Sequence, residues 1–164
     1  MNMFTDKINK VFIVAELSAN HHGDKEIAID SIIAAKKAGA DAIKLQTYTP
    51  DTMTIDCKNE FFTKVLEGSI WQGRSLYNLY EEAYTPWEWH EKLFEVANEE
   101  GILCFSAPFD KTAVDFLEQF NPPAYKIASF EIIDIPLIEY VASKGRPMIL
   151  STGIANLEDI ELAV

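Results

Sequence analysis

The apolar positions of this chain form five short runs, and each run has a polar side chain at or near its carboxyl end. Successive side chains of a strand point to opposite faces, so in the second run Lys44 and Gln46 share a face that Leu45 does not. A single lysine on an exposed strand face would need no further explanation. Because the pattern recurs five times, we interpret the polar ends as parts of one site. The predicted strands cover residues 11–16, 41–50, 102–106, 124–128 and 147–151.

Helical patterns separate these strands. Asp24 is placed to cap a helix that runs to about residue 37, with Gly39 just past its end. The stretch Thr85–Glu88 has Thr at the cap, Pro at the first position and Glu at the third, which predicts a capping box and a helix ending at Gly101. The other helices are predicted over residues 76–83, 110–120 and 135–143 and from 156 onward, whereas residues 48–75 have no clean period and are predicted to be a loop.

The alternation of strands and helices predicts an α/β fold with a parallel sheet covered by helices. A doubly wound open sheet is one candidate, but no glycine-rich phosphate-binding fingerprint follows the first or second strand. In a (β/α)8 TIM barrel the active site lies at the carboxyl ends of the strands, where the polar groups of this chain fall. We therefore predict a TIM barrel.

Eight strand–helix units close a TIM barrel, usually within about 250 residues. This chain has 164 residues and five predicted strands. We therefore predict a barrel that is truncated after about five strands. Residues 1–10 are expected to be a polar lead-in, and residues 11–164 the N-terminal portion of the barrel.

Composition and charge narrow the range of partners. The hydrophobic share of 48% and the charged share of 24% are those of a soluble globular domain. A net charge of −12 opposes binding to nucleic acid or to an anionic membrane. The apolar run Val11–Ala15 is too short for a membrane helix or a signal peptide. Cys57 and Cys104 have no metal-binding or redox spacing and are expected to be free thiols, which indicates a cytoplasmic protein.

Two lysines are the strongest candidates for binding an anion in this acidic chain. Lys44 and Lys126 are predicted to converge from neighbouring strands. Hydroxyl donors would come from Ser106, Ser129 and Ser151. Two ammonium groups and several hydroxyls suit a phosphorylated or carboxylated small molecule.

Other roles for these charges stay open. Each lysine can instead form a structural ion pair with Glu16 or Glu131. Lys126 can also be read as a Schiff-base lysine of the kind that aldolases use on similar barrels. Glu16 is a candidate for orienting a substrate hydroxyl or for acid–base catalysis, with a salt bridge to Lys44 as the alternative.

The loop after the first strand contains Asn20, His21 and His22. A histidine pair suggests metal binding, but adjacent residues rarely bind one ion, and no third ligand is near in the sequence. We prefer a polar loop that contacts a sugar. The aromatic residues of the helix after Thr85 are assigned to packing, and His90 is expected at the surface.

Six stretches of the chain together resemble one known family, the sialic acid synthases. The stretches are VAELSANHHG, AIKLQTYTPDTMT, LYNLYEEAYTPWEWH, FSAPFDKTAVDFLE, PAYKIASFEIIDIPLIEYVASKG and PMILSTGI. The resemblance covers residues 11–164 and is nearest to the branch that makes pseudaminic acid. The branches that make legionaminic acid and N-acetylneuraminic acid are alternatives within the same family.

The resemblance implies an N-terminal catalytic TIM barrel that condenses phosphoenolpyruvate with the open-chain aldehyde of an acetamido sugar and releases phosphate. It implies catalytic roles for Glu16, beside the sugar, and for Lys126, on phosphoenolpyruvate. The remaining substrate contacts are expected from Lys44, Gln46, Ser106, Ser129, Ser151, Asn20, His21 and Glu131.

The resemblance also implies groups that this chain does not supply. A divalent metal, Mn or Mg, would activate the sugar aldehyde, with its histidine ligands beyond Val164 and none in this chain. Full-length members are expected to be homodimers with a C-terminal antifreeze-like domain, which is absent here. We therefore expect the chain alone to be inactive, and a non-catalytic truncated product is the alternative of another class.

One residue departs from the pattern of the resembled family. Ala107 stands where the family commonly has a Ser or Thr that contacts phosphate. Because Ala has no hydroxyl, that contact is expected to be lost or to shift to Ser106.

Overall fold

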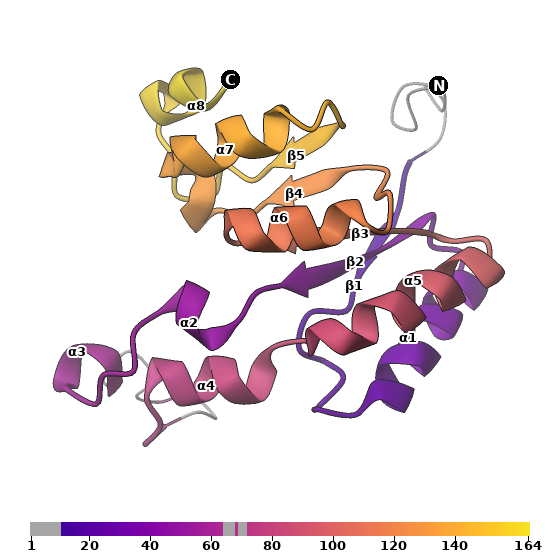
Figure 1. Ribbon diagram of the computed structural model, residues 1–164, viewed down its shortest axis with the longest axis horizontal. Coiled ribbons are helices and arrows are strands. Elements are labelled where there is room, and N and C mark those ends of the chain that lie inside the picture. The colour runs from indigo at the N-terminus through magenta and orange to yellow at the C-terminus, as the bar shows by residue number, and fades with distance from the viewer. Residues whose placement is uncertain (1–10, 64–67, 69–71) are drawn as a thin grey trace.

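The computed structural model describes residues 11–63, 68 and 72–164, and it places five parallel strands in one sheet (Figure 1). The strands lie side by side in chain order, from β1 to β5. A doubly wound sheet would change direction at a switch point, so this order confirms the truncated barrel of TIM type. The strands are β1 (Val14–Glu16), β2 (Ala42–Thr47), β3 (Leu103–Pro108), β4 (Tyr125–Ile127) and β5 (Met148–Leu150).

Helices fill every connection between successive strands, as the alternating pattern predicts (Figure 1). The helices are α1 (Lys25–Lys37), α2 (Pro50–Met53), α3 (Glu60–Thr63), α4 (Leu76–Ala83), α5 (His90–Glu99), α6 (Lys111–Glu118), α7 (Ile135–Ala142) and α8 (Leu157–Ala163), and the 3-10 turns are η2 (Trp87–Trp89) and η3 (Phe130–Ile133). No helix in the described part of the chain is both long and apolar enough to cross a membrane.

Three of these helices begin at the residues that the sequence indicates. The Asp24 carboxylate accepts a hydrogen bond from the Glu26 backbone N–H at 2.8 Å. Asp110 and Asn156 accept bonds from the first turns of α6 and α8 in the same way. These caps satisfy amide groups that no helix can pair internally.

Two local predictions are wrong. The capping box at Thr85 does not form: a 3-10 turn covers Trp87–Trp89, and α5 begins only at His90. The predicted loop over residues 48–75 contains α2 and α3, while residues 64–67 and 69–71 of that stretch lie outside the described part of the chain. Helix α5 begins later than predicted because the Thr85 hydroxyl is hydrogen-bonded to His21 instead of capping the helix.

Two apolar clusters hold the helices against one face of the sheet. The first includes Ile32, Ile43, Leu45 and Leu93, which join β2 to α1 and α5. The second includes Leu117, Tyr125, Ile127 and Val141, which join β4 to α6 and α7. All eight side chains are at most 2% exposed, so this face of the sheet is the core. Functional side chains must therefore come from the opposite face or from the strand ends.

Candidate active site

The face of the sheet opposite the helices, here called the inner face, carries the charged groups. In the parallel register Glu16 lies beside Lys44, and Gln46 lies beside Ala107. Lys126 has the opposite parity to Tyr125 and Ile127, which pack in the core, so it belongs to the inner face as well. Strand alternation therefore places Glu16, Lys44, Gln46 and Lys126 on one face of the sheet.

Glu16 and Lys44 form an ion pair across β1 and β2. The Lys44 Nζ atom donates to Glu16 Oε1 at 2.8 Å, and the Ser18 hydroxyl donates to the same oxygen at 3.0 Å. The lysine side chain is 10% exposed and the carboxylate 52%. Burial alone would raise the pKa of Glu16, but the hydrogen bond and charge of Lys44 lower it below its usual value. Glu16 therefore stays ionised.

Lys126 is held differently from Lys44. Its Nζ atom donates to the Ser151 hydroxyl and to the Ile127 carbonyl, both at 2.5 Å. Burial, and next the positive charge of Lys44, lower the pKa of Lys126, and the charges of Glu16 and Glu131 oppose that change. The predicted ion pair of Lys126 with a carboxylate is thus not formed among the described residues.

The two lysines are not on neighbouring strands, which corrects the sequence prediction. β3 lies between β2 and β4, and it presents Phe105 and Ala107 to the inner face. Lys44 and Lys126 nevertheless interact electrostatically across β3, and the positive charge of Lys44 lowers the pKa of Lys126. An anion between them would meet two ammonium groups across a narrow apolar strip.

A cavity of about 500 Å³ opens at the carboxyl ends of the strands. Every one of the first four strands contributes to it through its last residue or the loop that follows. The lining residues are Ser18, Ala19, Gln46, Tyr48, Met53, Leu79, Tyr80, Ala83, Phe109, Ala128, Ser129, Phe130 and Glu131. This is the position that the barrel prediction gives to the active site.

Glu131 supplies an unpaired acceptor to this cavity. Its Oε2 atom is buried and has no hydrogen-bond partner among the described residues. Burial raises the pKa of Glu131, although the charge of Lys126 lowers it in part. A buried carboxyl oxygen without a partner costs free energy, so it is available to a ligand.

The loop after β5 closes tightly on Ser129. A Cβ atom added at Gly153 would lie 3.1 Å from the Ser129 hydroxyl oxygen and 3.7 Å from its Cβ. The glycine therefore leaves room for the Ser129 hydroxyl at the cavity. Sequence reasoning singled out both serines but missed Gly153.

Ser106 lies on the other face, away from the lysines. It is fully buried, and its hydroxyl is 2.7 Å from the Thr47 hydroxyl, which in turn lies 2.8 Å from Nε2 of His90. The expectation of a surface His90 is wrong, since this side chain is 0% exposed. The structure thus places Ser106 in the layer between the sheet and α5, and not in the cavity.

The direction of this buried hydrogen-bond chain follows from its last acceptor. The Pro86 carbonyl can only accept, so Nδ1 of His90, 3.3 Å away, carries the proton. Nε2 must then accept from Thr47, and Thr47 from Ser106. Burial lowers the pKa of His90 to about 4, so the ring is neutral at pH 7.

His21 is also buried and neutral. The Gly23 backbone N–H donates to its Nδ1 atom at 3.1 Å, so Nε2 carries the proton and donates to the Thr85 hydroxyl at 3.2 Å. Burial lowers the pKa of His21. Its neighbour Asn20 is exposed and donates to the Leu17 carbonyl at 2.8 Å. Both residues shape the loop after β1, and neither lines the cavity.

The segment of residues 84–90, here called the brace, links the loops after β1 and β2 to strand β3. Thr85 binds His21 after β1, and the Trp87 indole N–H donates to the Tyr48 carbonyl after β2 at 3.1 Å. His90 reaches Thr47 and, through it, Ser106 of β3. The Thr, Trp and His side chains that make these contacts lie in the stretch AYTPWEWH, which sequence reasoning assigned to a helix start.

No metal site is complete within the described residues, because none of them form a group of three or more His, Cys, Asp or Glu that could hold an ion. Both nitrogens of His21 are engaged in hydrogen bonds, which removes it as a ligand. The residues present therefore do not fit a divalent ion, and no chemical step is assigned to one.

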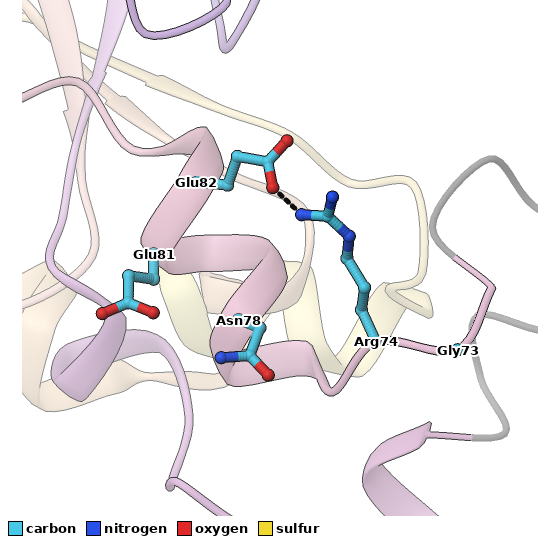
Figure 2. Close-up of a pocket in the computed structure, with 5 residues that line it drawn as sticks. All are labelled: Gly73, Arg74, Asn78, Glu81 and Glu82. Carbon is cyan, nitrogen blue, oxygen red and sulfur yellow. Dashed lines mark ion pairs between the residues drawn. The ribbon is translucent and has the colours of Figure 1, made fainter.

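A second hollow lies on α4 and is shown in Figure 2. Gly73, Arg74, Asn78, Glu81 and Glu82 line it, and Arg74 forms an ion pair with Glu82. None of these residues comes from a strand end, and the charged ones are exposed. The hollow is a solvated surface feature of the α4 region.

Comparison with known proteins points to one family. The model of the NeuB family matches residues 31–164. The chain is 57% identical over 159 residues to a pseudaminic acid synthase of Campylobacter jejuni, covering 97% of this chain and 45% of that protein. It is 49% identical over 152 residues to a pseudaminic acid synthase of Helicobacter pylori, covering 93% and 44%.

A solved structure agrees with these relatives. The N-acetylneuraminic acid synthetase of Leptospira borgpetersenii, crystallised with citrate, superposes with a TM-score of 0.79 at 33% identity, covering 94% of this chain and 49% of that one. The chain therefore spans about half the length of the relatives that it matches.

The neutral state of His90 predicts how stability depends on pH. Its pKa of about 4 in the fold lies below the ordinary 6.5, so the unfolded chain binds more protons between these values. The neutral ring's contribution to the free energy of unfolding is complete above pH 6.5 and is lost as pH falls toward 4, by up to about 3 kcal/mol. The free energy of unfolding, measured in urea, should therefore differ less between pH 7 and pH 5 in His90→Gln than in the parent chain.

His22→Gln is the matched control, because His22 is exposed. It should keep the pH dependence of the parent chain. An unchanged pH dependence in His90→Gln would contradict a neutral buried His90.

Proposed function

Because the chain belongs to the NeuB family, we propose that it is the first part of a pseudaminic acid synthase. This transferase condenses phosphoenolpyruvate with 2,4-diacetamido-2,4,6-trideoxy-altrose to give pseudaminic acid and phosphate. The observation that carries the proposal is the inner face, where Lys44, Lys126 and Ser151 lie at the carboxyl ends of the strands. The N-acetylneuraminate and legionaminate branches of the family are the alternative products.

The anion side of the site is built from the two lysines. Lys44 and Lys126 offset the charge of phosphoenolpyruvate. Ser151 already lies 2.5 Å from Lys126 Nζ, and Ser129 lies at the cavity beside the Gly153 loop. Their hydroxyls donate to phosphate oxygens in this assignment.

The sugar side is built from acceptors and an amide. Glu16, which Lys44 keeps ionised, accepts a hydrogen bond from a sugar hydroxyl. Gln46 offers both a donor and an acceptor to the cavity. Glu131 offers its unpaired Oε2 atom to the cavity, where it accepts a hydrogen bond from a hydroxyl of the sugar.

In the proposed reaction, C3 of phosphoenolpyruvate forms a bond to the aldehyde carbon, whose oxygen takes up a proton. Water adds at C2, and the bond from C2 to the phosphate oxygen then breaks to release phosphate. We expect a divalent metal, Mn or Mg, to be held by ligands outside this chain, where it would supply Lewis-acid chemistry. We propose that the full-length protein is a cytoplasmic homodimer, and that this chain alone is inactive.

Removing the Lys126 charge should cripple the use of phosphoenolpyruvate. In a full-length synthase that contains this chain, Lys126→Met should lower kcat/KM for phosphoenolpyruvate by about 100-fold or more, because a partly buried charge that faces the substrate is lost. Phosphate release measures the rate. Lys92→Met is the matched control, since the Lys92 side chain on α5 is 42% exposed and pairs with Glu95. Unchanged turnover in Lys126→Met would refute the assignment.

Gly153→Ala should act through Ser129. The added methyl group forces the Ser129 hydroxyl to move, so KM for phosphoenolpyruvate should rise by about 2- to 10-fold, the worth of one hydrogen bond. In a Ser129→Ala background the same substitution should have little further effect. Additive effects of the two substitutions would show that Gly153 acts by another route.

A lysine-dependent aldolase is the second candidate, because the lowered pKa of Lys126 is a condition for Schiff-base chemistry. Borohydride reduction with pyruvate or the sugar aldehyde would trap such an intermediate covalently. We expect no mass increase in the full-length protein. An adduct located on Lys126 would favour the aldolase instead.

A further inference from the structure

The cavity at the strand ends has one apolar wall that the proposed reaction does not explain. Its members from α2 and α4 are Met53, Leu79 and Ala83, and these side chains offer no strong hydrogen-bond donor or acceptor. Tyr80 of α4 and Phe130 of η3 extend the wall with aromatic surface. Nothing in the chemistry of phosphoenolpyruvate, which is charged, requires such a surface.

We propose that this wall, here called the methyl wall, selects a substrate sugar for its methyl groups. The inference rests on the proposed function and states which groups of the sugar this cavity would contact. Met53, Leu79 and Ala83 are the residues that determine specificity.

The cavity has both apolar and polar lining residues, so a complementary ligand must carry both kinds of group. The same cavity is also lined by the polar groups of Ser18, Gln46, Ser129 and Glu131, which come from β2 and from the loops after β1 and β4. A ligand that satisfies both sides carries hydroxyl or carbonyl oxygens along one edge and apolar substituents along the other. A hydroxyl turned toward the wall would lose its water and gain no partner.

The wall is held in place before any ligand binds. The Tyr77 hydroxyl of α4 donates to Asp51 of α2 at 3.1 Å, which ties the two helices together. The Tyr48 ring packs edge to face against Tyr80 at 5.8 Å and against Phe109 at 5.4 Å. Burial raises the pKa of Tyr48 to about 12.

The brace supports the same wall through Tyr48, which packs against Tyr80. Trp87 donates to the Tyr48 carbonyl, and Tyr48 is 4% exposed. A preformed apolar surface of this kind gains binding energy without a cost of ordering. It can therefore discriminate between substrates that differ in one small group.

Two methyl groups of an acetamido deoxy sugar can meet the wall: the C6 methyl of a 6-deoxy sugar and the methyl of an N-acetyl group. Both present the same chemistry, an apolar carbon at the edge of a polar molecule. A hydrophobic pocket discriminates by roughly 10- to 200-fold for one methylene group or one added hydroxyl.

The test measures kcat/KM for two pairs of sugars in a full-length synthase that contains this chain. One pair differs at C6, with a methyl or a hydroxymethyl group, and the other differs at nitrogen, with an acetyl or a formyl group. We expect the parent enzyme to prefer the methyl-bearing member of at least one pair by about 10-fold or more. In Leu79→Asn, which has a similar size and is polar, that preference should fall to about 3-fold or less.

Glu81→Gln is the matched control, because Glu81 is exposed on the same helix α4, and it should keep the parent preference. Met53→Gln is the second variant, from α2, and it should reduce the same preference if Leu79→Asn does not fold. The pair whose preference falls identifies which methyl group meets the wall.

The outcomes separate this inference from the proposed function. A parent enzyme that turns over these sugars but shows no preference, or variants that slow both members of each pair equally, overturn the methyl wall and leave the synthase assignment standing. A parent enzyme that releases no phosphate with any of the sugars overturns both.

Discussion

The inner face carries two lysines, Lys44 and Lys126, and the negative charge of Glu16 offsets part of the repulsion between them. Glu16 pairs directly with Lys44 and acts on Lys126 through its charge, raising a pKa that burial and Lys44 lower. The other charged group of the site, Glu131, lies at the cavity with an unpaired oxygen. An anionic substrate would complete this arrangement, because its charges would meet the two ammonium groups that Glu16 only partly offsets.

Besides the ion pair between Glu16 and Lys44, a set of neutral hydrogen bonds links the strand ends. Residues 84–90 connect the loops after β1 and β2 and the end of β3 through His21, Thr47 and the Tyr48 carbonyl. The histidines and hydroxyl groups of this network are buried, so a protonated histidine would leave an unpaired donor and a buried charge. The charged inner face and the apolar methyl wall are therefore supported by uncharged hydrogen bonds of the brace. The strength of these bonds does not depend on the charge of a bound ligand.

The pattern of apolar residues and helix caps was enough to predict the fold. The positions of the site residues could not be predicted in full, because they depend on how the strands pair. Asp24 and Asp110 cap helices through bonds within their own turns, and such bonds are visible in the sequence. Ser106 was assigned to the wrong face because β3 is apolar on both sides, and only its pairing with Leu45 reveals its parity. His90 was misplaced because its partner Thr47 is 43 residues away. The apolar wall has no periodic signal at all.

The two thiols of the chain have opposite chemical accessibility. Cys104 is buried in the core, and burial raises its thiol pKa far above the usual range, so almost no thiolate exists there at neutral pH. Cys57 is partly exposed between α2 and α3. A thiol-reactive dye would therefore attach at Cys57 without any engineered cysteine, and it would sit on the stretch that follows Met53. The native chain thus carries its own reporter for movement beside the cavity.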